Sequence, residues 1–153
     1  PWPANTTIKA GGDNDRITTA YNGGVYVDTI ELGNGNDVAY TWDGNDDVMG
    51  ESGDDEIYLG DGDDKADGGT GSDHLYGNDG DDDLIAGTGG LEATPDYLVG
   101  GADTDCVCGG TAAQTNDNGW DVLNAETCIY WATGSKDNVA ACGTPTVAAS
   151  CGC

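Results

Sequence analysis

The sequence predicts an all-β parallel solenoid of about five coils that ends in a small C-terminal cap. Three observations favour this fold: a nine-residue pattern that runs through residues 23–85 without a gap, small turn-forming residues early in most copies, and one apolar residue at a fixed place in each copy. A unit this short cannot bury its apolar side alone, so the copies must stack on one another. We therefore expect a thin stack of coils without a large globular core.

Ten copies of the pattern can be aligned. They occupy residues 10–18, 23–85 (seven copies), 86–99 and 100–108, with insertions at 19–22 and 91–95. Every copy has aspartate at position six: Asp15, Asp28, Asp37, Asp46, Asp55, Asp64, Asp73, Asp82, Asp96 and Asp105. Every copy has an apolar residue at position eight: Ile17, Ile30, Ala39, Val48, Ile57, Ala66, Leu75, Leu84, Leu98 and Val107.

Within each copy, the pattern predicts a glycine-rich turn at positions one to six and a short strand at positions seven to nine. Because side chains alternate along a strand, position eight should point inward and positions seven and nine outward. Two copies complete one coil, so residues 18 apart stack at about 4.8 Å per coil. The position-eight residues form the expected core together with Leu32, Leu59 and Ala86 at position one.

This stacking sorts the repeat aspartates into two columns, one along each edge of the coils. The first column contains Asp15, Asp37, Asp55, Asp73 and Asp96, and the second contains Asp28, Asp46, Asp64, Asp82 and Asp105. Stacked carboxylates repel one another by about 1 kcal/mol per neighbouring pair in water, and by more at lower dielectric. A cation between the coils would remove this repulsion.

Calcium is the cation that suits such a column, because it accepts six to eight oxygen ligands in loose geometry, whereas magnesium demands a tight octahedron. We predict that the ten aspartates and neighbouring backbone carbonyls bind up to about eight Ca²⁺ ions in the gaps between coils. The best sites should be those with the most regular turns: Asp37, Asp46, Asp55, Asp64, Asp73 and Asp82.

The pattern resembles the calcium-binding nonapeptide repeat of the RTX family, Gly-Gly-x-Gly-x-Asp-x-apolar-x. The resemblance covers about two-thirds of the chain. It implies a right-handed parallel β-roll at residues 10–108, with calcium between neighbouring turns on each edge. Residues 1–9 are then an entry segment that ends in a short strand. Residues 109–153 form the cap, with short strands expected at 120–123 and 127–133.

Composition limits the partners of the chain. The formal charge of −25 disfavours nucleic acid and anionic membrane surfaces, since both attract positive charge. No apolar run is long enough to insert into a membrane.

Six cysteines, all from Cys106 onward, favour disulfides in the cap and a secreted protein. Their pairing stays open, and a zinc site made by the two Cys-x-Cys pairs is the alternative. The start at Pro1, without an initiator methionine, is typical of a processed secreted chain.

The two outer faces of the stack are expected to differ. Tyr40, Tyr58 and Tyr76 all fall at position nine, 18 residues apart, and should form an exposed ladder. Such a ladder is either a contact surface for carbohydrate or protein, or cross-strand packing that shields the sheet. The opposite face is predicted to be acidic, with Asp43, Asp61, Asp79, Asp47 and Asp83.

No catalytic motif is present. His74 is the single histidine, it lies at an outward position, and its neighbour Asp73 belongs to the calcium pattern. We therefore predict no enzymatic activity.

The sequence favours an extracellular structural or surface protein whose β-roll folds on binding Ca²⁺ and which self-associates into a filament or layer. The alternative is a non-catalytic accessory or secretion module of a secreted hydrolase or toxin.

Overall fold

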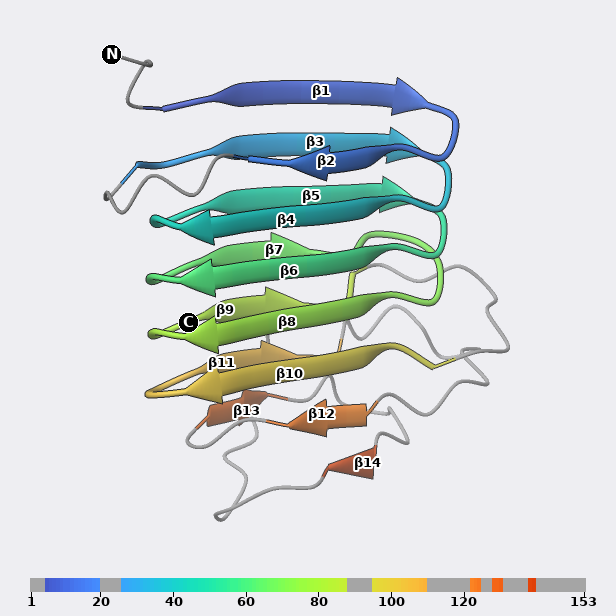
Figure 1. Ribbon diagram of the computed structural model, residues 1–153. Coiled ribbons are helices and arrows are strands. Elements are labelled where there is room, and N and C mark those ends of the chain that lie inside the picture. The colour runs from blue at the N-terminus through green and yellow to red at the C-terminus, as the bar shows by residue number, and fades with distance from the viewer. Residues whose placement is uncertain are drawn as a thin grey trace.

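The chain winds into a stack of coils with a β-sheet on either side (Figure 1). This is seen in a computed structural model that describes residues 5–19, 26–87 and 95–109 and three short strands beyond them. Consecutive strands alternate between the two sheets, so each pair of strands makes one coil, and all registered pairs are parallel. The described residues contain no helix. The all-β parallel solenoid is thereby confirmed.

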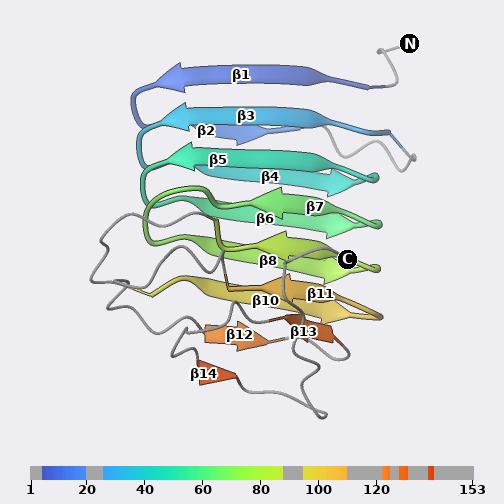
Figure 2. The same cartoon turned by 180° about the vertical axis from the view of Figure 1, so that it is seen from behind.

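The odd-numbered sheet contains β1 (Thr7–Gly12), β3 (Thr29–Asn34), β5 (Asp47–Ser52), β7 (Lys65–Asp67), β9 (Asp83–Ile85), β11 (Cys106–Cys108) and β13 (Cys128–Tyr130). The even-numbered sheet contains β2 (Arg16–Thr18), β4 (Val38–Asp43), β6 (Glu56–Asp61), β8 (His74–Asp79), β10 (Tyr97–Ala102), β12 (Val122–Asn124) and β14 (Asn138–Val139). Figure 2 shows the same succession from behind.

Strand register confirms that residues 18 apart stack. Asp47 in β5 pairs with Thr29 in the coil before it and with Lys65 in the coil after it. The offset is larger where a coil carries an insertion, as between Thr7 and Thr29. The solenoid amounts to about four turns, where ten copies predicted five.

The strands are longer than expected. Seven strands have six residues, because they continue through positions one to three of the next copy, which the pattern assigned to the turn. The physical reason is position one, where Leu32, Thr41 and Leu59 are buried inside the coil. The Thr41 hydroxyl donates a hydrogen bond to the Leu59 carbonyl at 2.7 Å. Only positions four to six remain for the turn.

The core is the thin apolar stack that the pattern predicts. The residues at position eight from the second copy on, and the three apolar residues at position one, have at most 3% of their surface exposed. They are Ile30, Leu32, Ala39, Val48, Ile57, Leu59, Ala66, Leu75, Leu84, Ala86, Leu98 and Val107. Ile17 of the first copy packs against this core and is only partly buried.

The entry segment belongs to a further copy that the aspartate pattern missed. Thr7 in β1 pairs with Thr29, and Ile8 packs against the core in the place of position eight. Thr6 occupies position six, and its N–H donates to Asp28 Oδ1 at 2.9 Å. The alignment required aspartate at position six, so this copy, which has threonine there, was not recognised. The in-phase Ile8 was the signal that could have found it.

The C-terminal region begins as a continuation of the solenoid. Strands β12 and β13 pair in parallel with β10 and β11, and β14 pairs with β12. Short strands were expected near these places, at 120–123 and 127–133, and they extend the two sheets beyond the last repeat. Cys106 and Cys108 are buried, with 9% and 1% exposed, although positions seven and nine are more exposed in most other copies. The rest of residues 110–153, and with it the pairing of the other cysteines, lies outside the described residues.

Close contact between turns explains the glycine at position four. Gly62 has a φ of +143°, and a Cβ atom built on it would lie 1.6 Å from the carbonyl oxygen of Gly44 in the preceding coil. Gly53 is in the same situation, 1.7 Å from the Gly35 carbonyl oxygen. A side chain at these positions would force the coils apart.

We expect Gly62→Ala to lower the free energy of unfolding of the calcium-loaded protein by about 2–5 kcal/mol, through left-handed strain and overlap with the neighbouring turn. Gly12→Ala is the matched control, because its Cβ would meet only Asn34 atoms at 3.7 Å or more. It should change stability by less than about 0.5 kcal/mol. Urea denaturation measures both variants, and equal effects would contradict the contact argument.

Candidate metal site in the aspartate columns

The ten repeat aspartates lie in the two columns that the sequence predicts, each at the end of a turn, just before a strand. Eight of them are buried: Asp28, Asp37, Asp46, Asp55, Asp64, Asp73, Asp82 and Asp105. Asp15 and Asp96, in the copies beside the insertions, are half-buried. Burial of so many carboxylates requires that their oxygens be satisfied by other groups.

Each column is a ladder of hydrogen bonds between coils. From Asp37 on, the Oδ1 atom of each repeat aspartate accepts the backbone N–H of the aspartate one coil earlier. In the first column, Asp37 N–H donates to Asp55 Oδ1 at 2.8 Å and Asp55 N–H to Asp73 Oδ1 at 2.9 Å. In the second column, Asp46 N–H donates to Asp64 Oδ1 at 2.6 Å and Asp64 N–H to Asp82 Oδ1 at 3.0 Å. The ladder accounts for one oxygen of each carboxylate.

The second oxygen is the one that a cation would meet. Within the described residues, the buried Oδ2 atom accepts no hydrogen bond in Asp37, Asp46, Asp55, Asp64 and Asp82. The backbone carbonyls of Gly53 and Gly62, at position four, also accept none there. Carboxylate and carbonyl oxygens are the ligands that Ca²⁺ prefers. The donor set therefore fits calcium.

Side chains alone do not form the site. In the ranges that the structure describes, no group of three or more His, Cys, Asp or Glu side chains gathers in a way that could hold a metal ion. A calcium ion between coils would thus take carboxylate oxygens from the columns and complete its shell with backbone carbonyls. This division of ligands is the one that the sequence predicts, and the identity of the individual ligands stays a prediction.

Burial controls the charge state of the columns. It raises the pKa of Asp55 to about 6, and that of Asp64 and Asp82 to about 7. The backbone N–H that each carboxylate accepts lowers its pKa, and the neighbouring carboxylate of the same column raises it. Burial likewise raises the pKa of Asp46. Without a cation, these carboxyl groups are therefore harder to ionise than an exposed aspartate.

A second ladder of hydrogen bonds, at position five, lies next to the columns and was not predicted from the repeat pattern. Asp54 N–H donates to Asn36 Oδ1 at 3.1 Å, and Ser72 N–H donates to Asp54 Oδ1 at 3.0 Å. On the other edge, Asp81 N–H donates to Asp63 Oδ1 at 3.2 Å. These bonds run opposite to those of the columns, since the later coil donates. They explain why position five favours Asn and Asp, whose side chains accept such bonds.

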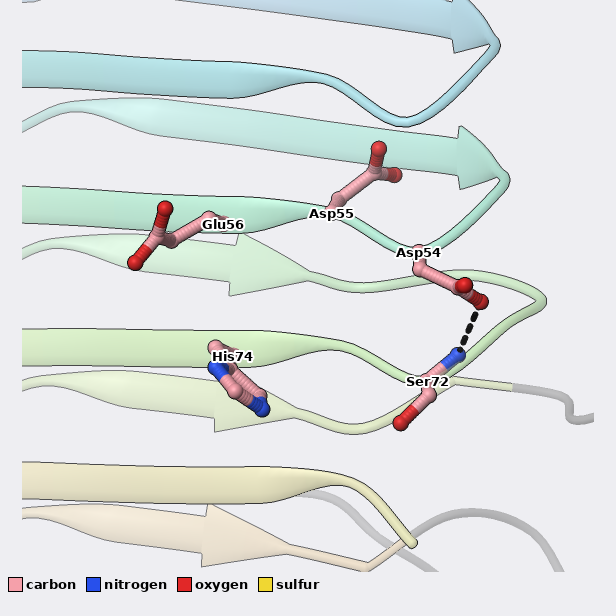
Figure 3. Close-up of a pocket in the computed structure, with 5 residues that line it drawn as sticks. All are labelled: Asp54, Asp55, Glu56, Ser72 and His74. Atoms are coloured by element: carbon pink, nitrogen blue, oxygen red, sulfur yellow. Dashed lines mark hydrogen bonds between the residues drawn. The ribbon is translucent and has the colours of Figure 1, made fainter. Parts of the chain in front are cut away.

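A hollow of about 430 Å³ opens beside Asp55 (Figure 3) and is lined by Asp54, Asp55, Glu56, Ser72 and His74. Glu56 and His74 face each other across β6 and β8. The Ser72 hydroxyl donates to the Pro95 carbonyl at 2.8 Å, and the His74 ring meets the Tyr97 ring edge-on at 5.8 Å. Ser72 and His74 thus contact different residues, and the two side chains do not form a pair of nucleophile and general base.

The tyrosine ladder forms on the even-numbered sheet, although its side chains are half-buried and not exposed as predicted. Tyr40 and Tyr58, and Tyr58 and Tyr76, stack with ring centroids 4.7 Å apart and nearly parallel planes. The guanidinium of Arg16 lies 4.8 Å above the Tyr40 ring, and Tyr97 tilts against Tyr76 at 6.0 Å. The ring faces are therefore occupied by cross-strand packing. A hydrogen bond to Glu56 raises the pKa of the Tyr58 hydroxyl.

The expectation of a separate acidic face was wrong in part. Asp43, Asp61 and Asp79 end β4, β6 and β8, and so belong to the same sheet as the tyrosines. Asp47 and Asp83 do lie on the other sheet, in β5 and β9. The reason is that the strands continue through position three, which carries these aspartates along the tyrosine-bearing sheet.

Comparison with known proteins agrees with this geometry. The family model of the RTX calcium-binding nonapeptide repeat matches residues 22–57 and 58–90, a segment that contains seven of the repeat aspartates. No curated protein and no solved structure matches the chain significantly. Within the described ranges, no helix has the length and apolar character needed to cross a membrane.

The raised pKa values predict how the calcium-free protein responds to pH. Asp64 has a pKa of about 7 in the fold and an ordinary value of 3.8, so the folded state binds more protons between these values. Stability should therefore fall as the pH rises through this window. We expect circular dichroism in calcium-free buffer to show more β-structure near pH 5 than near pH 7.5.

Asp64→Asn tests the cause of this pH dependence. The neutral amide keeps an oxygen acceptor for the Asp46 N–H and has no charge to bury. It should raise the β-signal of the calcium-free protein near pH 7.5 and flatten the pH profile. A wild-type signal that grows as the pH rises would contradict the assignment.

Proposed function

We propose that this chain, whose residues 22–90 are RTX calcium-binding nonapeptide repeats, is an extracellular structural or surface protein whose β-roll folds when it binds Ca²⁺. RTX repeats of this kind form calcium-binding β-rolls. The observation that carries the proposal is the row of buried Oδ2 atoms in Asp37, Asp46, Asp55, Asp64 and Asp82 that accept no hydrogen bond in the described part. A cation would satisfy them.

The proposed ligands are the ten aspartates of the two columns, which with backbone carbonyls would bind up to about eight Ca²⁺ ions between coils. The sites should be strongest in the regular coils and weaker at the ends. Burial supports this order, since Asp55 and Asp64 are 2% and 1% exposed, whereas Asp15 and Asp96 are half-buried. A half-buried carboxylate stays hydrated and gains less from a cation.

Calcium binding and folding should be coupled, because a site between two coils exists only when the coils are stacked. Each occupied site then adds RT ln(1 + [L]/Kd) to the stability of the folded state. Extracellular calcium modules bind at roughly 10⁻⁴ to 10⁻³ M. If several sites bind together, the chain would change from unfolded to folded within that range of calcium concentration.

Six cysteines, all from Cys106 onward, support an extracellular location and a disulfide-linked cap, because disulfides persist in oxidising compartments. Cys106 and Cys108 are both buried. The pairing of the cysteines and the zinc alternative stay open.

Self-association is supported by the edge strands of the stack. Among the strands that the structure describes, β1 and β2 stand at the edges of their sheets, and the register of β1 is with β3. An unpaired edge presents N–H and C=O groups to which a second chain can add. We therefore propose that calcium-loaded molecules associate through this end into filaments or layers.

Titration with calcium tests the central proposal. Circular dichroism should show little β-structure in chelator near neutral pH and a cooperative gain as calcium is added. Asp55→Ala and Asp64→Ala should raise the calcium midpoint roughly twofold or more, because each removes a charged ligand. Asp47→Ala is the control of equal charge, on the outer face of β5, and should leave the midpoint nearly unchanged. Equal midpoints in all variants would remove these aspartates from the site.

Electron microscopy tests the assembly. Filaments or layers should appear with calcium and disappear in chelator, because chelation unfolds the edge strands. Soluble monomers under both conditions would refute the assembly proposal and leave calcium-dependent folding intact.

A further inference from the structure

A chemically labile pair of residues lies at the end of β3, outside the aspartate columns and the core. Asn34 is followed by Gly35. In such a pair the backbone nitrogen of the glycine can attack the side-chain amide of the asparagine, because glycine has no side chain to hinder the approach. Asn34 is exposed, and within the described residues it is the only asparagine that precedes a glycine. Its reactivity therefore depends on how the fold holds the backbone.

In the stack, the peptide group that joins the two residues is hydrogen-bonded to both neighbouring coils. The Gly35 N–H donates to the Ser52 carbonyl at 2.8 Å in the coil after it. The Asn34 carbonyl accepts the Asp13 N–H at 3.0 Å in the coil before it. The attack requires this peptide group to rotate until its nitrogen faces the Asn34 side chain, and the rotation would break both bonds. The stacked coils thus keep the nucleophile away from the amide.

The two products of the reaction fit the stack differently. One product is ordinary aspartate, which already occupies position three before a glycine at Asp43, Asp61 and Asp79. The other is isoaspartate, in which the chain continues through the former side chain and the backbone is one carbon longer. Gly35 has a φ of +136°, and a Cβ atom built on it would lie 2.3 Å from the Asp13 carbonyl oxygen. A longer backbone at this point would shift the turn out of register with its neighbours.

We propose that Asn34 is a modification site that forms isoaspartate when the coils are apart and is protected when they are stacked. The Gly35 nitrogen forms a bond to the side-chain carbonyl carbon of Asn34. The amide nitrogen leaves as ammonia and takes the proton of the Gly35 N–H, which gives a cyclic imide. One water molecule then opens the imide at either carbonyl, to give aspartate or isoaspartate. The step is a hydrolysis in balance, and water is its only co-reactant.

The consequence is a limit on how long the unfolded chain can wait before it refolds. A chain that stays open accumulates isoaspartate, so its unfolding becomes irreversible with time. The inference rests on the proposed function only for its trigger: if calcium stacks the coils, then loss of calcium starts the reaction. Unfolding by urea should start the same reaction, whatever the role of calcium.

The test follows the peptide that contains Asn34 by mass spectrometry, with isoaspartate identified from its fragmentation. The full chain is incubated at mildly alkaline pH in calcium, in chelator and in urea. We expect the reaction in chelator and in urea to be at least about tenfold faster than in calcium, because opening must precede it. Asn22 also precedes a glycine and lies outside the described residues. It is the internal reference, and in urea it should react at a rate similar to that of Asn34.

Refolding tests the difference between the two products. Chains aged in chelator are returned to calcium, and folded and unfolded chains are separated by size-exclusion chromatography. Isoaspartate at residue 34 should be depleted severalfold from the folded fraction, whereas aspartate should not. Asn34→Asp reproduces the tolerated product, so its calcium midpoint should lie within about twofold of wild type. Asn34→Ser has the residue found in register at Ser52 and no amide to attack, so it should refold more completely than wild type after ageing.

Two results would overturn the proposal: equal reaction rates of Asn34 in calcium and in urea, or equal isoaspartate content in the folded and unfolded fractions. A reaction that is slow in both calcium and chelator but fast in urea would have a different meaning. It would refute calcium-dependent folding and support the protection of Asn34 by the stacked coils.

Discussion

Burial of a carboxylate at every interface between coils is the constraint on which the structure depends. Each carboxylate accepts the backbone N–H of the coil before it, as Asp64 does from Asp46, which fixes the distance and the register of the stack. The same arrangement leaves a second oxygen inside, as in Asp55 and Asp82. Close turns such as Gly44 and Gly62, the raised pKa values and the fit to a divalent cation all follow from it.

The sequence was sufficient for the features that depend on phase alone. The core residues, the two aspartate columns and the tyrosine ladder all follow from the 18-residue period, because a period determines which residues stack. The period does not determine how far a strand continues, which depends on burial of Thr41 and Leu59. For that reason Asp61 was expected on the wrong sheet.

The hydrogen-bond ladders could not be derived from the pattern, because they depend on which backbone donor each carboxylate faces. The N-terminal copy was missed for a different reason. Recognition relied on the aspartate at position six, which is Thr6 in that copy, although Thr6 N–H still donates to Asp28. The backbone hydrogen bond of the position is therefore kept even where the carboxylate side chain is lost.

The stack is also modular in a way that limits how it can change in length. The insertions at 19–22 and 91–95 widen the register offset to 22 and 23 residues and leave the same strands paired. A complete coil of two copies could be added or deleted between identical interfaces. A single added copy would transfer every downstream strand to the opposite sheet and break the tyrosine row apart. Such a protein should therefore gain or lose copies in pairs. An odd number would break up the outer face of the sheet on which its function depends.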